Sequence, residues 1–211
     1  MDAIPDDRSP PHRPPSSATP VTGAAASAAS PAGEWRTAGC DVPRTPDVVT
    51  IGGGGTMPVT PPALDAAMAR IDGTGRHGFA DSYAGLEVDQ DEVCAIVYRV
   101  PSPAFDEAIR DAAGDACVVV RDAAHPLDEL TRWQQRVVGD LPMWSGRGVD
   151  IFTVGARHDG AGVQIGARDV EPARRELTEH YGAGAPLIVV GQDPVVTLPA
   201  AGPATAPPPG R

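Results

Sequence analysis

One spacing occurs twice in this sequence and limits the folds that the chain can adopt. An apolar, β-branched run begins at Val93, and another begins at Cys117, 24 positions later. The same interval separates the runs that begin at Val163 and Leu187, and the second pair follows the first by 70 positions. Short runs of this composition are typical of strands, and the interval leaves room for a helix. The sequence therefore predicts two copies of one structural unit.

Each copy also contains a shorter strand-like segment before its first strong strand. In the second copy, Asp159-Gly160 separates these two segments and is a hairpin-turn signal. Ser102 followed by Pro103 is typical of a helix start, and Gly114 of a helix end. A helix between two strands allows those strands to lie parallel. We therefore expect an α+β fold of two ββαβ units, with helices packed on one face of small mixed sheets. The expected strands are 86–89, 93–100, 117–120, 149–154, 163–167 and 187–190, and the expected helices are 103–112, 126–139 and 169–181.

Proline and glycine are unevenly distributed along the chain. Residues 1–62 contain 12 Pro and 7 Gly, whereas the longer stretch 79–195 contains 7 Pro and 12 Gly. A stretch poor in large apolar side chains cannot bury enough area to offset its chain entropy. The expected segments are a disordered Pro/Ala/Ser-rich stretch at 1–47, a glycine-rich linker with a short helix at 48–78, a two-lobed domain at 79–196 and a disordered tail at 197–211.

Charge argues against two classes of partner. All 17 basic residues are Arg, the net charge is -11, and residues 79–195 carry 20 acidic residues against 10 Arg. An acidic domain repels a phosphate backbone and an anionic lipid surface, so we expect no nucleic-acid binding. The chain lacks an apolar stretch long enough to span a membrane. Its acidic start lacks the apolar core of a secretory signal, so we expect the chain as written to be cytoplasmic, with export possible if the true start differs.

The three cysteines form no CxxC pair and have no nearby histidine, so we expect no metal site. Cys94 and Cys117 fall on strands that we expect to be neighbours, which makes them the candidate disulfide pair. The alternative is that both are small buried apolar side chains. Cys40 lies in the stretch expected to be disordered.

Motifs for catalysis and cofactors are weak. The run Gly52–Gly55 is not followed by a phosphate-binding Gly-Lys pair, and the chain has no Lys, so we expect no nucleotide or other cofactor. No Gly-x-Ser-x-Gly motif occurs. A small hydrolase would have to use His158 or Ser145, both of which have an ordinary interpretation as turn residues. We therefore predict no catalytic residue and expect that the protein is not an enzyme.

The segment 141–148 is flanked by proline and glycine and predicts an exposed loop. It contains Trp144, Ser145 and Arg147, an aromatic residue beside polar ones. We expect these three residues to form a contact surface.

Several short motifs between residues 79 and 192 resemble the prosegment of secreted bacterial serine proteases of the α-lytic-protease type. They are 79–89 with the strand 93–100, 118–121, 128–130, 149–154, 159–160 and 163–165. The resemblance implies a two-lobed α+β module that binds a protease domain and templates its folding. No protease motif follows in this chain, so the resemblance implies no catalytic residue here.

These observations lead to one principal hypothesis and two alternatives. The principal hypothesis is a non-enzymatic module that binds another protein through the edges of its hairpin strands, with a prosegment-like or chaperone-like role. The first alternative is a regulatory domain that binds a small molecule between its lobes. The second is a small hydrolase that uses His158 or Ser145.

Overall fold

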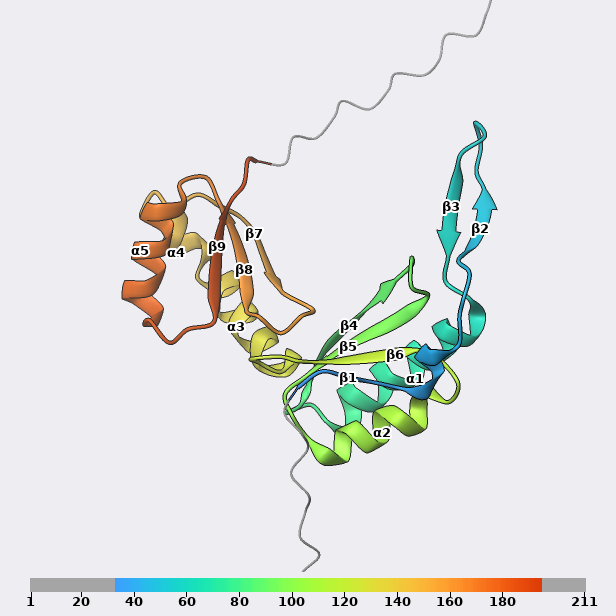
Figure 1. Cartoon of the computed structure of the whole chain (residues 1–211). Coiled ribbons are helices and arrows are strands. Elements are labelled where there is room, and N and C mark those ends of the chain that lie inside the picture. The colour runs from blue at the N-terminus through green and yellow to red at the C-terminus, as the bar shows by residue number, and fades with distance from the viewer. Residues whose placement is uncertain (1–32, 195–211) are drawn as a thin grey trace, which may run out of the picture.

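The computed structural model describes residues 33–194, which form two lobes joined by a helix (Figure 1). The first lobe contains β1 (Trp35–Arg36), η1 (Ala38–Asp41), α1 (Pro62–Gly78), β4 (Tyr83–Asp89), β5 (Cys94–Arg99), α2 (Pro103–Ala113) and β6 (Val118–Asp122). A separate hairpin of β2 (Asp47–Thr50) and β3 (Thr56–Val59) extends from it. The second lobe contains α3 (Leu127–Gly139), α4 (Leu141–Gly146), β7 (Ile151–Ala156), β8 (Val163–Ala167), α5 (Val170–Tyr181) and β9 (Leu187–Gly191).

The strand pairings confirm an α+β fold with two ββαβ units. β4 and β5 are antiparallel, and β6 lies parallel to β5 after α2. β7 and β8 are antiparallel in the same way, and β9 lies parallel to β8 after α5. Tyr83 pairs with Arg99 and Ile151 with Ala167, so equivalent hairpin residues are 68 positions apart. The expected offset of 70 was wrong because the first apolar run begins in the turn, where Val93 has φ 51°.

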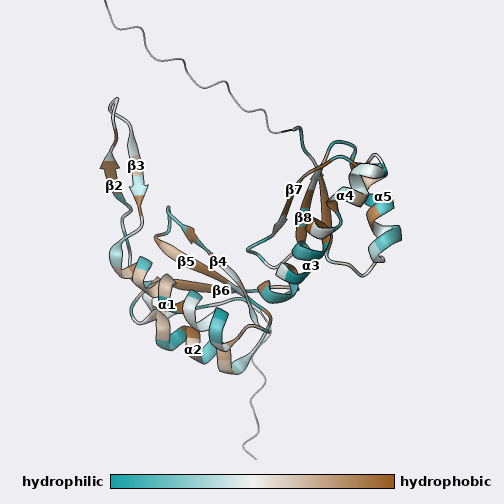
Figure 2. Cartoon of the chain, turned by 180° about the vertical axis from the view of Figure 1, so that it is seen from behind, coloured by the Kyte–Doolittle hydropathy of each residue, from teal (hydrophilic) through white to brown (hydrophobic). Residues whose placement is uncertain are grey.

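Helices cover one face of each sheet. In the first lobe, Phe105 of α2 stacks on Phe79 with ring centroids 4.9 Å apart and meets Tyr83 edge-on. In the second lobe, α3, α4 and α5 contribute buried side chains to one core with the sheet. Figure 2 shows that β5, β6 and β8 are largely hydrophobic, whereas the helices carry both hydrophilic and hydrophobic residues. As predicted, the Ser102 side chain accepts a hydrogen bond from Phe105 N at the start of α2, at 3.4 Å.

The segment 48–78 is a hairpin and a long helix, so the expectation of a linker with a short helix was wrong. Helix α1 has 17 residues and buries Leu64 and Ile71 in the first core. The glycines of this helix led to the wrong expectation, but the glycine at position 75 is explained by packing. A Cβ at Gly75 would lie 2.5 Å from Cγ of Tyr83, so the helix needs glycine to approach that ring.

Part of the stretch expected to be disordered is folded onto the first lobe. β1 pairs antiparallel with β6, with Trp35 opposite Val120, and the Arg110 guanidinium lies 4.2 Å from the centroid of the Trp35 ring. Residues 1–32 and 195–211, where we also expected disorder, lie outside the described residues. Among residues 33–194, the helices include none with the length and apolarity needed to cross a membrane.

Candidate protein-binding surfaces

The disulfide joins Cys40 to Cys117, and Cys94 is free and buried. The predicted Cys94–Cys117 pair was therefore wrong, although Cys94 and Cys117 do lie on neighbouring strands. The reason is the fold of the N-terminal stretch. Thr37 accepts a hydrogen bond from Val118 N through its side chain and donates to Val118 O through its backbone N, which places the following η1 turn beside Cys117.

The contact surface predicted at Trp144, Ser145 and Arg147 is only partly exposed. The segment forms helix α4 rather than a loop, and Trp144 is completely buried in the second core. Its Nε1 donates a hydrogen bond to the Tyr181 hydroxyl at 3.2 Å. Ser145 and Arg147 are exposed. The prediction for Trp144 was wrong because one short helical turn directs the indole inward.

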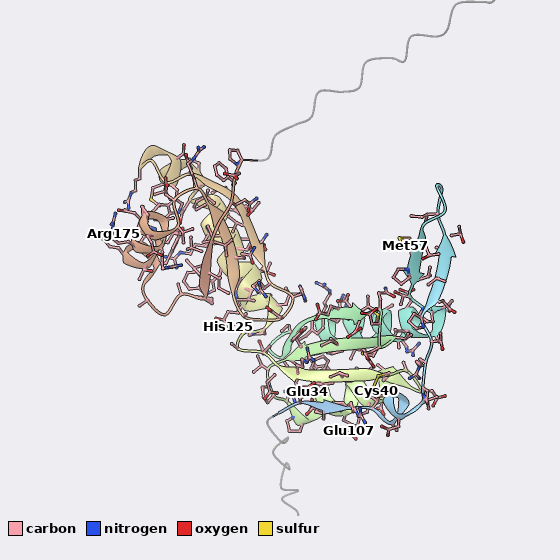
Figure 3. The ribbon with its side chains drawn as sticks, turned by 45° about the horizontal axis from the view of Figure 1, so that its top comes forward. Glu34, Cys40, Met57, Glu107, His125 and Arg175 are labelled. Atoms are coloured by element: carbon pink, nitrogen blue, oxygen red, sulfur yellow. A yellow bond between two sulfur atoms is a disulfide. The ribbon has the colours of Figure 1, made fainter. Side chains whose placement is uncertain are left out.

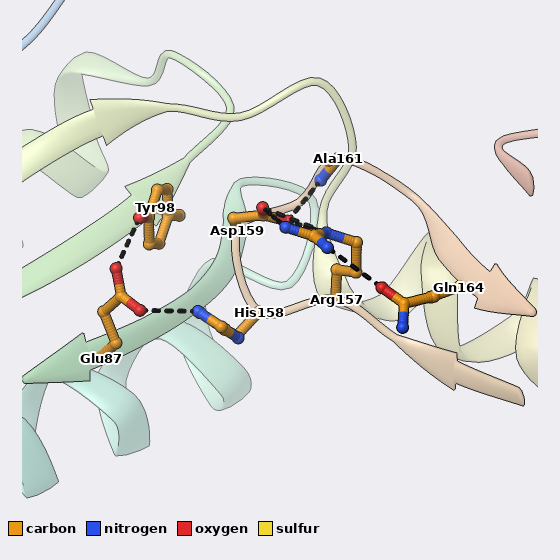
Figure 4. A network of polar contacts seen from close by, with 7 residues as sticks. All are labelled: Glu87, Tyr98, Arg157, His158, Asp159, Ala161 and Gln164. Atoms are coloured by element: carbon orange, nitrogen blue, oxygen red, sulfur yellow. Dashed lines mark hydrogen bonds and ion pairs between the residues drawn. The ribbon is translucent and has the colours of Figure 1, made fainter. Parts of the chain in front are cut away.

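His158 lies at the junction of the two lobes (Figure 4). Its Nε2 is 2.8 Å from Oε2 of Glu87, whose Oε1 accepts a hydrogen bond from the Tyr98 hydroxyl at 2.7 Å. The Tyr98 hydrogen bond holds the pKa of Glu87 below its usual value, against the opposing effect of partial burial. Within residues 33–194, the hydrogen bonds of His158 include none to a serine or cysteine side chain. Ser145 lies on α4, so the structure does not bring the two hydrolase candidates together.

The β7–β8 turn is packed closely against the first lobe. Backbone N of His125 donates to O of Gly160 at 3.1 Å, and a Cβ at Gly160 would lie 2.9 Å from Cβ of Ala84. Figure 3 shows His125 where the chain passes from one lobe to the other. Within the turn, Asp159 forms an ion pair with Arg157 and accepts a hydrogen bond from Ala161 N. The turn is thus a closely packed contact between the lobes.

Two hollows lie at the lobe junction. One has a volume of about 170 Å³ and is lined by Arg76, Tyr83, Leu127 and Asp128, among others. The other, of about 360 Å³, is lined by His158 together with residues of β7 and β8. Small-molecule sites usually occupy about 300–1,000 Å³ and are mostly apolar. The first hollow is smaller than such sites, and the second has Arg157, His158 and Gln164 in its lining, so it is not mostly apolar. The described residues contain no cluster of three or more His, Cys, Asp or Glu side chains that could hold a metal ion.

The second sheet has one open edge, at β9. The strand order is β7-β8-β9, so among the described strands β9 pairs with β8 alone. O of Pro186 accepts from Val163 N, and N of Gln192 donates to Ala167 O, so both groups point toward β8. Because backbone groups alternate along a strand, the N–H groups of Val189 and Gly191 point away from the sheet. They form a row that a further strand could pair with.

The opposite edge of this sheet, at β7, is partly blocked by a side chain. The Gln134 amide of α3 accepts a hydrogen bond from Ala156 N at 3.2 Å and donates to Val154 O at 3.5 Å. These are two of the outward backbone groups of β7, so the amide takes part of the place of a neighbouring strand. Proteins commonly cover edge strands to prevent unwanted pairing. β9 lacks such a cover among residues 33–194.

In the first lobe, the edge equivalent to β9 is occupied. β6 follows α2 as β9 follows α5, and its outer side pairs with β1. The first sheet therefore has the order β1-β6-β5-β4, whereas the second stops at β9. The repeat thus contains one filled and one open copy of the same strand position.

The β2–β3 hairpin, which we call the arm, exposes large apolar side chains. Figure 3 shows Met57 on the arm, away from both lobes. The most exposed large apolar side chains of the described chain include Val48 at 61%, Met57 at 51%, Ile51 at 47% and Val49 at 45%. A two-stranded hairpin is marginally stable by itself, and clustered exposed apolar groups often mark protein contacts. The arm, which lies in the segment that was expected to be a linker, is thus a second candidate surface.

The expected contact was at the edges of the hairpin strands, so the edge at β9 and the arm were both missed, for identifiable reasons. The run Leu187–Val190 was recognised as a strand, and no further strand was expected after it. The position of this strand at the end of the predicted strand order was the signal from which an open edge could have been inferred. The arm could have been found from Val48–Ile51 and Met57 around the glycines, but the glycine run favoured a linker.

Comparison of the chain with protein-family models, curated proteins and solved structures finds no match.

Proposed function

We propose that this protein is a non-enzymatic binding module that takes an extended segment of another protein onto the open edge of β9. The observation that carries the proposal is the difference between two equivalent strand positions. β6 has a partner strand at its outer edge, β1, and β9 has none among the described residues.

Strand addition supplies the binding energy through the backbone. An added strand would pair with the outward N–H and C=O groups of Val189 and Gly191, while its alternate side chains contact the two faces of the sheet. β1 runs antiparallel to β6, so we expect the added strand to run antiparallel to β9. The partly blocked edge at β7 would direct the segment to β9, because Gln134 already bonds to two outward groups of β7, Val154 O and Ala156 N.

The partner would be a polypeptide with an accessible apolar strand. β9 carries Leu187, Ile188, Val189 and Val190, which suit apolar side chains in the added strand. The arm provides a second apolar contact, and its charge is limited to Asp47. Incompletely folded proteins expose such strands, which supports a prosegment-like or chaperone-like role. The resemblance of residues 79–192 to protease prosegments agrees with that role.

Selection from a displayed library of random ten-residue peptides tests the proposal without a known partner. Peptides that bind the full chain should be apolar and extended, and they should slow amide hydrogen exchange at Val189 and Gly191. Peptides that protect only other amides, or a selection that yields no binder, would contradict strand addition at β9.

A matched pair of variants at Gly191 sharpens the test. Gly191→Pro removes the outward N–H and should reduce the affinity of selected peptides at least tenfold. Gly191→Ala keeps that N–H, and its Cβ makes an ordinary contact of 3.6 Å with Cγ2 of Val170. The alanine variant should therefore bind like the unaltered protein. Equal loss in both variants, or in neither, would count against the proposal.

A further inference from the structure

The three cysteines of the chain meet on the face of the first sheet that the helices leave uncovered. Cys94 and Cys117 are buried in one small cluster, and Cys40 packs against it. All three line the same surface hollow of about 340 Å³. One disulfide, Cys40–Cys117, and one free thiol, Cys94, are therefore neighbours.

Strand register places the free thiol beside one sulfur of the disulfide. Ala95 of β5 pairs with Val118 of β6 in the parallel ladder, so the residues before them, Cys94 and Cys117, are also side by side. N of Ala95 donates to O of Cys117 at 3.0 Å. Side chains alternate between faces, so both cysteines share the face opposite Ala95 and Val118. Adjacent strands lie about 4.8 Å apart, which is within the Cα separation of about 4.4–6.8 Å that a disulfide spans.

We propose that Cys94, Cys117 and Cys40 form a thiol–disulfide exchange site. The Cys94 thiol loses its proton, and its sulfur attacks Sγ of Cys117. The Cys94–Cys117 bond forms as the Cys40–Cys117 bond breaks, and Cys40 leaves as a thiolate that takes up a proton. One disulfide and one thiol are present before and after the step, so there is no net oxidation and no external oxidant is needed.

The exchange breaks the Cys40–Cys117 disulfide, which ties the N-terminal stretch to the sheet. Without it, η1 and the chain after it remain attached by polar contacts, such as the bonds from Thr37 Oγ1 to Ala116 O at 2.8 Å and from Arg44 to Asp115 O at 2.8 Å. The liberated Cys40 thiolate can then attack a small disulfide, RSSR, to give a Cys40–SR mixed disulfide and RS⁻. The site would thus take small thiols and disulfides, independently of strand addition at β9.

The surroundings of Cys94 determine how the exchange depends on pH. Burial raises the pKa of the Cys94 thiol, and the carboxylates of Asp89 and Glu92 raise it further, while Arg121 and Arg44 have the opposite effect. The thiolate is the attacking species, so the exchange should be slow at neutral pH and should accelerate as the pH rises. This behaviour would keep the Cys40–Cys117 form in place until conditions favour the thiolate.

Peptide mapping of the full chain tests the proposal directly. Cleavage after Arg puts the cysteines on separate peptides, 37–44, 77–99 and 111–121. Oxidised protein is held at pH 7 and at pH 9 without reductant, quenched in acid, alkylated with N-ethylmaleimide and analysed by mass spectrometry. We expect alkylated Cys40 and a linked 77–99/111–121 pair to appear, at least fivefold faster at pH 9 and at a rate independent of protein concentration.

Two variants complete the test. Cys94→Ser should retain the Cys40–Cys117 link at both pH values. Cys40→Ser should form the Cys94–Cys117 link when treated with oxidised glutathione, and its thermal melt shows whether it is folded. The proposal would be overturned if the folded protein is alkylated only at Cys94 at both pH values, although the same protein exchanges its disulfide in guanidinium chloride. Disulfide-linked dimers in place of the intramolecular product would overturn it as well.

Discussion

Gly85 of β4 lies directly against the backbone of His158 in the β7–β8 turn, so closely that a Cβ at Gly85 would come within 2.9 Å of Cα of His158. The two residues belong to different lobes. Gly85 also has φ +156°, a conformation that residues with a side chain rarely adopt. This contact, together with the one at Gly160, determines how closely the two ββαβ units approach each other.

We predict that Gly85→Ala loosens the lobe junction and lowers the free energy of unfolding by about 1–3 kcal/mol. Both the backbone conformation and the clash with His158 contribute. Urea unfolding followed by circular dichroism measures the effect. The control is Gly155→Ala in β7, where a Cβ would meet no atom within 4 Å and stability should be unchanged or slightly higher. Equal stability of the two variants would contradict the packing argument.

Glu87 should make the stability of the junction depend on pH. The Tyr98 hydrogen bond keeps the pKa of Glu87 below its usual value of 4.5. A carboxyl with a lowered folded pKa stabilises the fold above its unfolded pKa, and this contribution is lost as the pH falls through the folded pKa. We expect Glu87→Gln to lower the melting temperature at pH 7 and to match the unaltered protein well below pH 4. Glu107→Gln, at an exposed position on α2, is the control and should show no such trend.

Tyr181 satisfies the buried indole of Trp144 and donates to Oδ2 of Asp140 at 2.8 Å. Burial and the Asp140 carboxylate raise the pKa of Tyr181 to about 12. Tyr181→Phe leaves the Trp144 N–H buried without an acceptor, which should cost about 1–3 kcal/mol. Chemical denaturation followed by tryptophan fluorescence gives the value. The control is Tyr98→Phe, because the Tyr98 hydroxyl contacts a half-exposed carboxylate. If Tyr181→Phe costs no more stability than this control, the indole finds another acceptor.

Gln134 should matter more for association than for stability. Gln134→Ala removes both hydrogen bonds to β7, which should cost about 0.5–1.5 kcal/mol and leave a second open edge. We expect self-association that increases with concentration in sedimentation velocity. Gln134→Glu keeps an oxygen to accept from Ala156 N and should associate less. A strictly monomeric alanine variant would show that β7 is protected in another way.

The arm should contribute surface rather than stability. Val48→Ser combined with Met57→Ser should change the free energy of unfolding by less than about 0.5 kcal/mol, because both side chains are exposed. The same variant should bind less of a hydrophobic dye and less of the selected peptides that also contact the arm. Leu64→Ser, at a residue only 4% exposed, is the contrasting variant and should be strongly destabilising. Undiminished dye binding by the double variant would exclude the arm as the apolar surface.

Local pattern was enough to predict the repeated unit. The alternating and apolar runs around Val93 and Val163 specify strands, and Ser102 with Pro103 specifies a helix start, because these signals depend on neighbours in sequence. The two ββαβ units and their α+β class follow from that order. The same reasoning failed at Gly75, because its packing partner, the Tyr83 ring, belongs to another element.

Tertiary structure alone decided which cysteine bonds to Cys117, where Trp144 points and which strand edges stay open. Cys40 and Cys117 are 77 positions apart, and their pairing depends on β1 docking against β6. Trp144 turns inward because the second core has room for an indole beside Tyr181. Such outcomes depend on contacts between segments that are distant in the chain. Periodicity reports which side chains share a face of one element, but not which other element will cover that face.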